Sequence, residues 1–115
     1  MILVDSSVWI DFFRDGRSAQ SQTLARCLGD SSVEVGMADL VLFEVMRGFR
    51  EGALMRDAQS LMSALPQVEI GGTAPVLKAA ERYRQLRSQG RTVRSPIDVL
   101  LASYCMTHGH TLLHR

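Results

Sequence analysis

Short apolar runs alternate with longer helical patterns along the chain. Apolar runs at 1–4, 33–35, 68–70 and 111–113 have the length of strands buried in a sheet. Apolar residues at helical spacing predict helices over 18–29, 40–49, 53–65 and 74–89. A further helix is predicted before them, ending at Asp15–Gly16, and another after them, from Ser95–Pro96 to Gly109. Because strands and helices alternate, we expect right-handed crossovers. The predicted fold is therefore α/β, three-layered, with a mainly parallel central sheet of about four strands flanked by helices.

Local signals fix several helix ends. Ser6 or Ser7 can cap the first helix, and Asp39 has the position of an N-cap before the apolar run 40–49. Pro66 ends the predicted helix 53–65. Asp11 is expected to face solvent on the first helix. The predicted buried side of helix 74–89 is formed by Val76, Leu77, Ala80, Tyr83 and Leu86.

The composition is that of one globular domain. The chain has 115 residues, 46% hydrophobic and 22% charged, which is enough to bury a core without disulfides or metals. Cys27 and Cys105 lie far apart within predicted helices, which favours a reducing compartment, here the cytoplasm. The first residues lack a signal-peptide pattern, and no apolar run approaches the ~20 residues of a membrane span. We therefore expect a soluble protein that does not contact membranes.

The charge is divided unevenly along the chain. Residues 1–46 carry a net −4 and residues 47–115 a net +5, within a total of +1. Twelve of the thirteen basic residues are arginines, whose planar guanidinium suits phosphate recognition. A solvated surface held by salt bridges would have the same composition. Charge alone therefore leaves both interpretations open.

Three acids occupy positions where the pattern calls for apolar residues or the edge of a sheet. Asp5 follows the first strand, Glu44 interrupts the most apolar predicted helix of its half, and Asp98 begins an apolar helix. A buried carboxylate is unfavourable unless it is paired or binds a metal. Convergence of the three on Mg²⁺ or Mn²⁺ would explain them together, because these ions prefer oxygen ligands. Such an ion could activate water for phosphodiester hydrolysis, as in nucleases.

Each acid also has a purely structural interpretation. Asp5 could be a helix cap, and Asp98 could complete a capping box with Ser95. Glu44 could pair with Arg47 one turn later. The sequence contains no phosphate-binding glycine loop, no dinucleotide fingerprint and no serine nucleophile elbow.

Three ordered motifs resemble a known family. They are ILVDSSVWID at 2–11, EVMRGF at 44–49, and GRTVRSPIDVLLA at 90–102 followed by HGHTLLH at 108–114. Together they resemble the PIN-domain ribonucleases, and within these the VapC-type toxins of bacterial toxin–antitoxin pairs. The resemblance extends over essentially the whole chain and implies a PIN-like fold.

The resemblance implies a site and partners. Asp5, Glu44 and Asp98 would be the catalytic, Mg²⁺-coordinating acids, with Mn²⁺ as an alternative, and Ser7 would support the site. The implied reaction is cleavage of RNA by metal-activated water, leaving 5′-phosphate and 3′-hydroxyl ends. A homodimer and a VapB-type antitoxin are the implied partners. Arginines that flank the acidic motifs are predicted to contact the RNA backbone; they are Arg47, Arg91 and Arg94.

One departure from the family pattern changes the expectation. The pattern continues into a further acidic motif with a fourth carboxylate, which this chain lacks. We therefore expect a single PIN-like domain over residues 1–115 that is shortened at its C-terminal end. The alternative to an active ribonuclease is a weak or silent module that only binds its antitoxin or another protein. A phosphatase-like hydrolase is disfavoured, because a second aspartate does not follow Asp5 two residues later.

Overall fold

The chain forms short strands separated by longer helices. The computed structural model describes residues 1–91 and 95–115, which contain six helices and four strands. In chain order these are β1 (Ile2–Val4), α1 (Ser6–Arg14), α2 (Ala19–Leu28), β2 (Met37–Ala38), α3 (Asp39–Met46), α4 (Ala53–Ser63), β3 (Gln67–Val68), α5 (Thr73–Ser88), α6 (Pro96–His108) and β4 (Thr111–Leu113). The predicted α/β class is confirmed.

The strands pair in parallel, as predicted. β1 pairs with β4, with Ile2 opposite Thr111, and β2 pairs with β3, with Met37 opposite Gln67. The segment before β2 joins the two pairs, because the Ile2 N–H donates to the Glu34 carbonyl and the Ile2 carbonyl accepts from the Gly36 N–H. The strands thus form two small two-stranded sheets, which the bridge between Ile2 and Val35 connects.

The strand predicted over residues 33–35 is misplaced. Val35 makes an isolated bridge with Ile2, whereas the ladder with β3 forms two residues later, over β2. Both Val33 and Val35 are apolar, so the sequence pattern favoured them. The paired residues are instead determined by the position of β3 in the fold. A strand of two residues is too short for its apolar pattern to show which residues pair.

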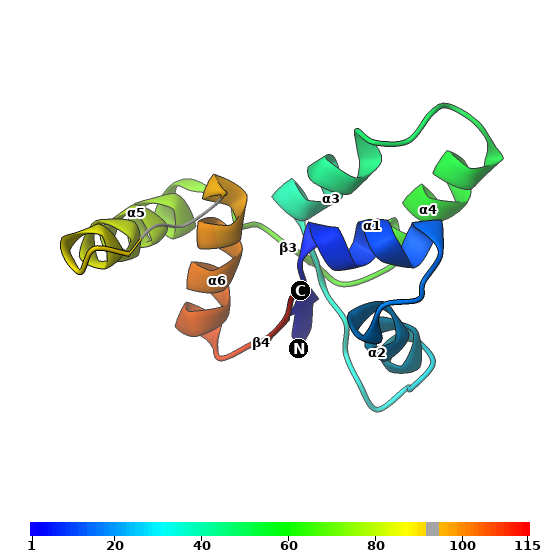
Figure 1. Cartoon of the computed structure of the whole chain (residues 1–115), viewed down its shortest axis with the longest axis horizontal. Helices are drawn as coiled ribbons and strands as arrows, with labels where there is room; N and C mark the ends of the chain where they lie inside the picture. The colour runs from blue at the N-terminus through cyan, green and yellow to red at the C-terminus, as the bar shows by residue number, and fades with distance from the viewer. Residues whose placement is uncertain (92–94) are drawn as a thin grey trace.

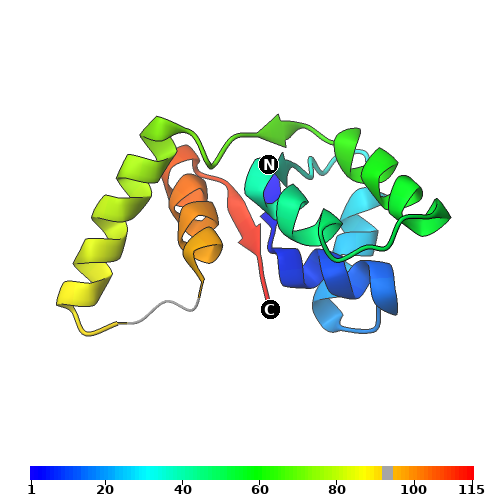
Figure 2. The same cartoon turned by 90° about the horizontal axis from the view of Figure 1, so that it is seen from above.

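Helices cover both sides of the strands. Figures 1 and 2 show α5 and α6 on one side of β1 and β4, and α1, α2, α3 and α4 on the other. The core between these layers includes Leu3 from β1, Trp9 from α1 and Leu101 from α6, all with almost no exposed surface. The predicted three-layer arrangement is confirmed, and it places the carboxyl end of β1 between α1 and α6.

The predicted buried side of the helix at 74–89 is partly wrong. In α5, Leu77 is 64% exposed and Val76 is also exposed, whereas Ala79 is buried. The reason is that α5 packs chiefly against α6, so only a narrow stripe of its surface is covered.

The longest helix, α5, has 16 residues, and no helix of the described residues is long and apolar enough to cross a membrane.

Asp39 has a different role from the one predicted. The N-cap of α3 is Ala38, and Asp39 lies in the first turn. Its carboxylate accepts the backbone N–H of Ile70 at 2.7 Å and of Gly71 at 3.3 Å. Asp39 therefore fastens the start of α3 to the segment after β3.

Asp11 was predicted to face solvent, and this prediction is only partly right. It is half-buried, and its Oδ2 accepts the Ser18 backbone N–H at 3.4 Å and the Ser21 hydroxyl. Hydrogen bonds from Ser18 and Ser21 hold the pKa of Asp11 below its usual value of 3.8. Asp11 thus ties α1 to the beginning of α2.

The lowered pKa of Asp11 gives a pH-dependent contribution to stability. Because the folded pKa is below the unfolded one, the ionised carboxylate stabilises the fold above about pH 3.8, and this contribution is lost as the pH falls through the folded pKa. We expect the difference in thermal midpoint between the parent chain and Asp11→Asn to be largest near neutral pH and to shrink in acid. Thermal unfolding across pH measures it, with Asp57→Asn, at an exposed position of α4, as the control. A constant difference would contradict the assignment.

Candidate active site

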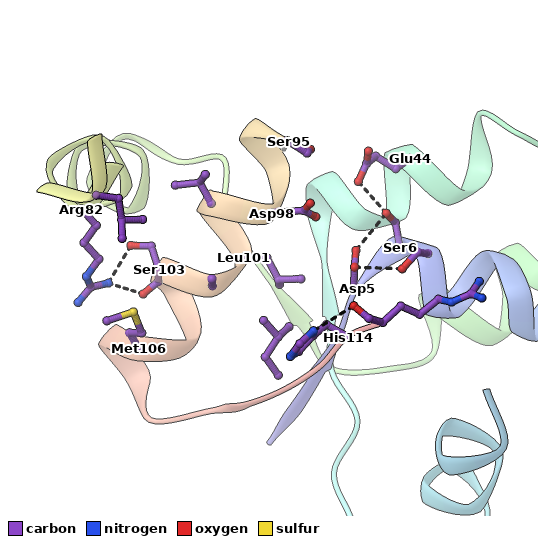
Figure 3. Close-up of a pocket in the computed structure, with 16 residues that line it drawn as sticks. Asp5, Ser6, Glu44, Arg82, Ser95, Asp98, Leu101, Ser103, Met106 and His114 are labelled. Carbon is purple, nitrogen blue, oxygen red and sulfur yellow. Dashed lines mark hydrogen bonds between the residues drawn. The ribbon is translucent and has the colours of Figure 1, made fainter. Parts of the chain in front are cut away.

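One cleft contains the acids that the sequence singled out. It has a volume of about 810 Å³ and lies at the carboxyl ends of β1 and β4 (Figure 3). In parallel sheets this is the usual place for a ligand. Its lining comprises Asp5, Ser6, Ser7, Glu44, Arg82, Leu86, Ser95, Asp98, Val99, Leu101, Ala102, Ser103, Met106, Leu112, His114 and Arg115. Residues from both ends of the chain and from its middle therefore meet there.

Asp5 is the residue at which β1 turns into α1. Its extended backbone makes it the N-cap of α1, but its side chain accepts no hydrogen bond from the backbone of the helix. Instead, the Asp5 carboxylate accepts the Ser7 hydroxyl at 3.0 Å and lies 3.4 Å from the Ser6 hydroxyl. The backbone of Asp5 therefore occupies the predicted N-cap position, but its carboxylate does not cap the helix. The carboxylate lines the cleft instead. Ser7 contacts the acid that it was predicted to support.

Ser6 connects two of the acids. Its hydroxyl donates to Glu44 Oε1 at 2.9 Å, while its oxygen lies 3.4 Å from Asp5 Oδ1. Because a hydroxyl has one proton, the shorter bond to Glu44 is the stronger. The side chain is nearly buried, at 9% exposure. The sequence indicated a possible cap role for Ser6 and disfavoured a nucleophile role, but not its contact with Glu44, because the wall that a serine faces depends on how α1 packs against α3.

Glu44 has two different neighbours. One carboxylate oxygen accepts from Ser6, and the other lies 3.9 Å from an Arg47 guanidinium nitrogen. The Arg47 side chain is 63% exposed and also lies over the Phe43 ring, so this ion pair contributes little. The predicted pairing with Arg47 is therefore present but weak, and Glu44 still lines the cleft.

Asp98 approaches the same cleft from α6. It lies in the first turn of that helix, whose N-cap is Ser95 and whose first residue is Pro96, as predicted. The Ser95 side chain makes no capping hydrogen bond, so its half of the predicted capping box is not formed. In the view of Figure 3, the Asp98 carboxylate points toward Asp5 and Glu44. Asp98 thus faces the other acids across the cleft.

The donors in the cleft fit a hard divalent cation by their chemistry. Asp5, Glu44 and Asp98 supply carboxylate oxygens from three elements, and Ser6 already joins the first two. Among residues 1–91 and 95–115, no three His, Cys, Asp or Glu side chains form a ready-made metal cluster. Mg²⁺ commonly takes one or two carboxylates directly and keeps several waters, so spaced acids suit it. The role of these acids as metal ligands stays a prediction.

Two of the three arginines predicted to bind RNA are not in the lining of the cleft. Arg47 and Arg91 are exposed and absent from its walls, and Arg94 lies outside the described residues. Arg82 of α5 and Arg115 line it instead. Sequence reasoning missed Arg82 because α5 carries several arginines and nothing in their spacing shows which one reaches α6.

The histidines near the end of the chain separate into two groups. His114 lines the cleft, whereas the rings of His108 and His110 lie against the Tyr104 ring, at ring centroid distances of 4.3 and 5.9 Å. These three rings are absent from the lining of the cleft.

Comparison with known proteins adds independent findings. The PIN domain family matches residues 2–115. The sequence is 30% identical over 115 residues to Ribonuclease VapC11 of Mycobacterium tuberculosis and to VapC ribonuclease Mb1587 of Mycobacterium bovis, covering 100% of this chain and 86% of each relative.

Solved structures agree in fold. VapBC2 from Rickettsia felis, bound to a DNA fragment from its promoter, has a TM-score of 0.70 at 17% identity, over 97% of this chain and 85% of that one. VapC20 of Mycobacterium tuberculosis, a Sarcin-Ricin loop cleaving toxin, has a TM-score of 0.69 at 19% identity, over 96% and 85%. At these identities the likeness shows the fold alone.

Proposed function

The chain belongs to the PIN-domain family, and we propose that it is a VapC-type ribonuclease toxin whose active site is the cleft lined by Asp5, Glu44 and Asp98. The observation that carries the proposal is the shared cleft. Three acids that are far apart in the sequence line one cavity at the carboxyl ends of parallel strands. The full-length identity to VapC ribonucleases supports RNA as the substrate class.

Hydrolysis of an RNA phosphodiester beside three carboxylates requires a positive charge at the acidic end of the cleft. Asp5, Glu44 and Asp98 would hold Mg²⁺, or Mn²⁺, which when bound supplies an activated water and neutralises charge on a phosphodiester. Without a cation the three carboxylates repel one another and the substrate. Ser6 orients Glu44, and Ser7 orients Asp5, through their hydroxyl donors. Hydrolysis by water leaves a 5′-phosphate and a 3′-hydroxyl in this proposal.

The partners follow from the same assignment. We propose neutralisation by a VapB-type antitoxin, supported by the fold shared with VapBC complexes. The homodimer and the cytoplasmic location remain part of the proposal. Both cysteines are free thiols, in keeping with a reducing compartment.

RNA cleavage in the presence and absence of Mg²⁺ tests the function. We expect the parent chain to cleave single-stranded or structured RNA with Mg²⁺, to be inactive in EDTA, and to recover with Mn²⁺. Asp98→Asn, which removes a charge from the cleft without changing the volume of the side chain much, is expected to lose this activity. Gel analysis of labelled RNA and its end groups measures both.

The competing functions give different results. A chain that binds a VapB-type antitoxin but cleaves no RNA with either metal would support the silent binding module. Metal-dependent hydrolysis of a small phosphate monoester, without RNA cleavage, would support the phosphatase-like alternative. Cleavage that persists in EDTA would contradict the metal-dependent mechanism and leave the family assignment intact.

A further inference from the structure

Arg82 is the basic side chain of α5 that lines the cleft. It is half-buried, and its Nη1 donates to the Ser103 carbonyl, to the Ser103 hydroxyl at 2.8 Å and to the Thr107 hydroxyl at 2.8 Å. Ser103 and Thr107 lie one turn apart on α6, and the Thr107 hydroxyl donates to the Ser103 carbonyl at 3.0 Å. The guanidinium is therefore held in place from one end by two residues of the neighbouring helix.

The rest of the guanidinium has further donors. Every hydrogen bond that Arg82 makes within the described residues uses Nη1. Arginine has five N–H donors in a planar arrangement, and those on Nη2 and Nε match two phosphate oxygens. A side chain already fixed by α6 loses less conformational entropy on binding an anion than a free one. Arg82 is thus preorganised for an oxyanion.

The position of Arg82 relative to the acids suits a polynucleotide. Its partner Ser103 lies five residues after Asp98 on α6, a rise of about 7.5 Å along the helix axis. In the view of Figure 3, Asp98 lies between Arg82 on one side and Asp5 and Glu44 on the other. An RNA strand carries a phosphate at every nucleotide. A strand that has one phosphate at the acids and runs along the cleft past α6 would present another phosphate to Arg82.

We propose that Arg82 is a phosphate-binding subsite of the cleft, which holds an RNA phosphate next to the one that is cleaved. The proposal rests on the proposed ribonuclease function and adds to it a residue that fixes the position of the strand. It also distinguishes Arg82 from Arg47, whose exposed side chain lies outside the lining of the cleft.

The salt dependence of RNA binding tests this subsite. The Asp98→Asn background, in EDTA, keeps a short fluorescein-labelled single-stranded RNA intact while its anisotropy is titrated over a range of KCl. Each phosphate contact contributes about 0.7 to the slope of log K against log salt for single strands. We expect Arg82→Gln to lower that slope by about 0.7 and to weaken binding about tenfold at low salt. Arg82→Lys keeps the charge and is expected to retain most of the slope.

Two controls separate the subsite from a structural link between α5 and α6. Arg84→Gln removes a charge from an exposed position of the same helix and is expected to leave the slope close to that of the background. Thr107→Val removes one acceptor of Arg82 and is expected to lower the thermal midpoint without changing the slope. A slope that Arg82→Gln leaves unchanged would overturn the subsite, even if the thermal midpoint falls.

The outcome also separates this inference from the proposed function. If the parent chain cleaves RNA with Mg²⁺ while Arg82→Gln keeps the full salt slope, the subsite alone is wrong. If the parent neither binds nor cleaves RNA, both proposals are wrong. An equal loss of slope in Arg84→Gln would show a general charge effect and would overturn the subsite as well.

Discussion

Asp5→Asn is expected to lower the rate of Mg²⁺-dependent RNA cleavage by more than about a hundredfold. Even residues that only support metal ligands change affinity or activity by about 10–100-fold when replaced, and Asp5 is proposed as a ligand. Asparagine keeps the size of the side chain but removes its charge. It also presents an NH₂ group where the Ser7 hydroxyl now donates to a carboxylate. Initial rates on labelled RNA, over a range of Mg²⁺ concentration, measure the effect.

The same variant needs a binding measurement and a matched control. We expect weaker Mn²⁺ binding, seen by electron paramagnetic resonance of the free ion, with a thermal midpoint close to that of the parent. Asp57→Asn, which also replaces an aspartate but on the exposed surface of α4, should change neither rate nor metal affinity. Parent-like cleavage by Asp5→Asn would show that the cleft is not the catalytic centre.

Trp9→Ala is expected to lower the free energy of unfolding by about 3–5 kcal/mol, the usual range for removing a large buried aromatic ring. Trp9 has no exposed surface, and its ring lies 5.9 Å from that of Phe12 and 5.8 Å from that of Phe13. Since native domains are stable by only about 5–15 kcal/mol, the variant would lose a large fraction of its stability. Urea denaturation followed by circular dichroism measures the loss.

Two further variants separate ring packing from other causes. The Trp9 indole Nε1 is buried without a hydrogen-bond partner among the described residues, so Trp9→Phe removes no hydrogen bond. We therefore expect Trp9→Phe to lose much less than Trp9→Ala. Leu54→Ala, at a residue that is 79% exposed, should change the free energy of unfolding by no more than about 0.5 kcal/mol. Equal losses for Trp9→Phe and Trp9→Ala would contradict this account of the core.

Helices could be predicted from the sequence better than strands. Apolar spacing and the Ser95–Pro96 start located every helix of the described residues to within a few positions. The strand near residue 35 was misplaced because its pairing depends on close approach of distant backbone. Gly36 shows this, since a Cβ there would lie 2.3 Å from the Met1 sulfur and 3.0 Å from a Leu3 methyl. The sequence pattern carries no information about such a contact.

The acids of the site could be predicted, but the groups around them could not. Asp5, Glu44 and Asp98 interrupt apolar patterns, and an acid in such a place needs an explanation. Ser6 and Arg82 have residue types that are common on helix surfaces, so no pattern marks them. Their roles come from packing of α1 against α3 and of α5 against α6. The sequence therefore indicated which acids are unusual, whereas tertiary packing determines which side chains surround them.

The pairing of β1 with β4 can form only after nearly the whole chain has been synthesised. Ile2 and Thr111 become neighbours although nearly the whole chain separates them, so this loop closes only late in translation. Until α6 and β4 have been synthesised, Asp5 has no Asp98 opposite it and one wall of the cleft is missing. The proposed nuclease site can therefore assemble only when synthesis of the domain is nearly finished.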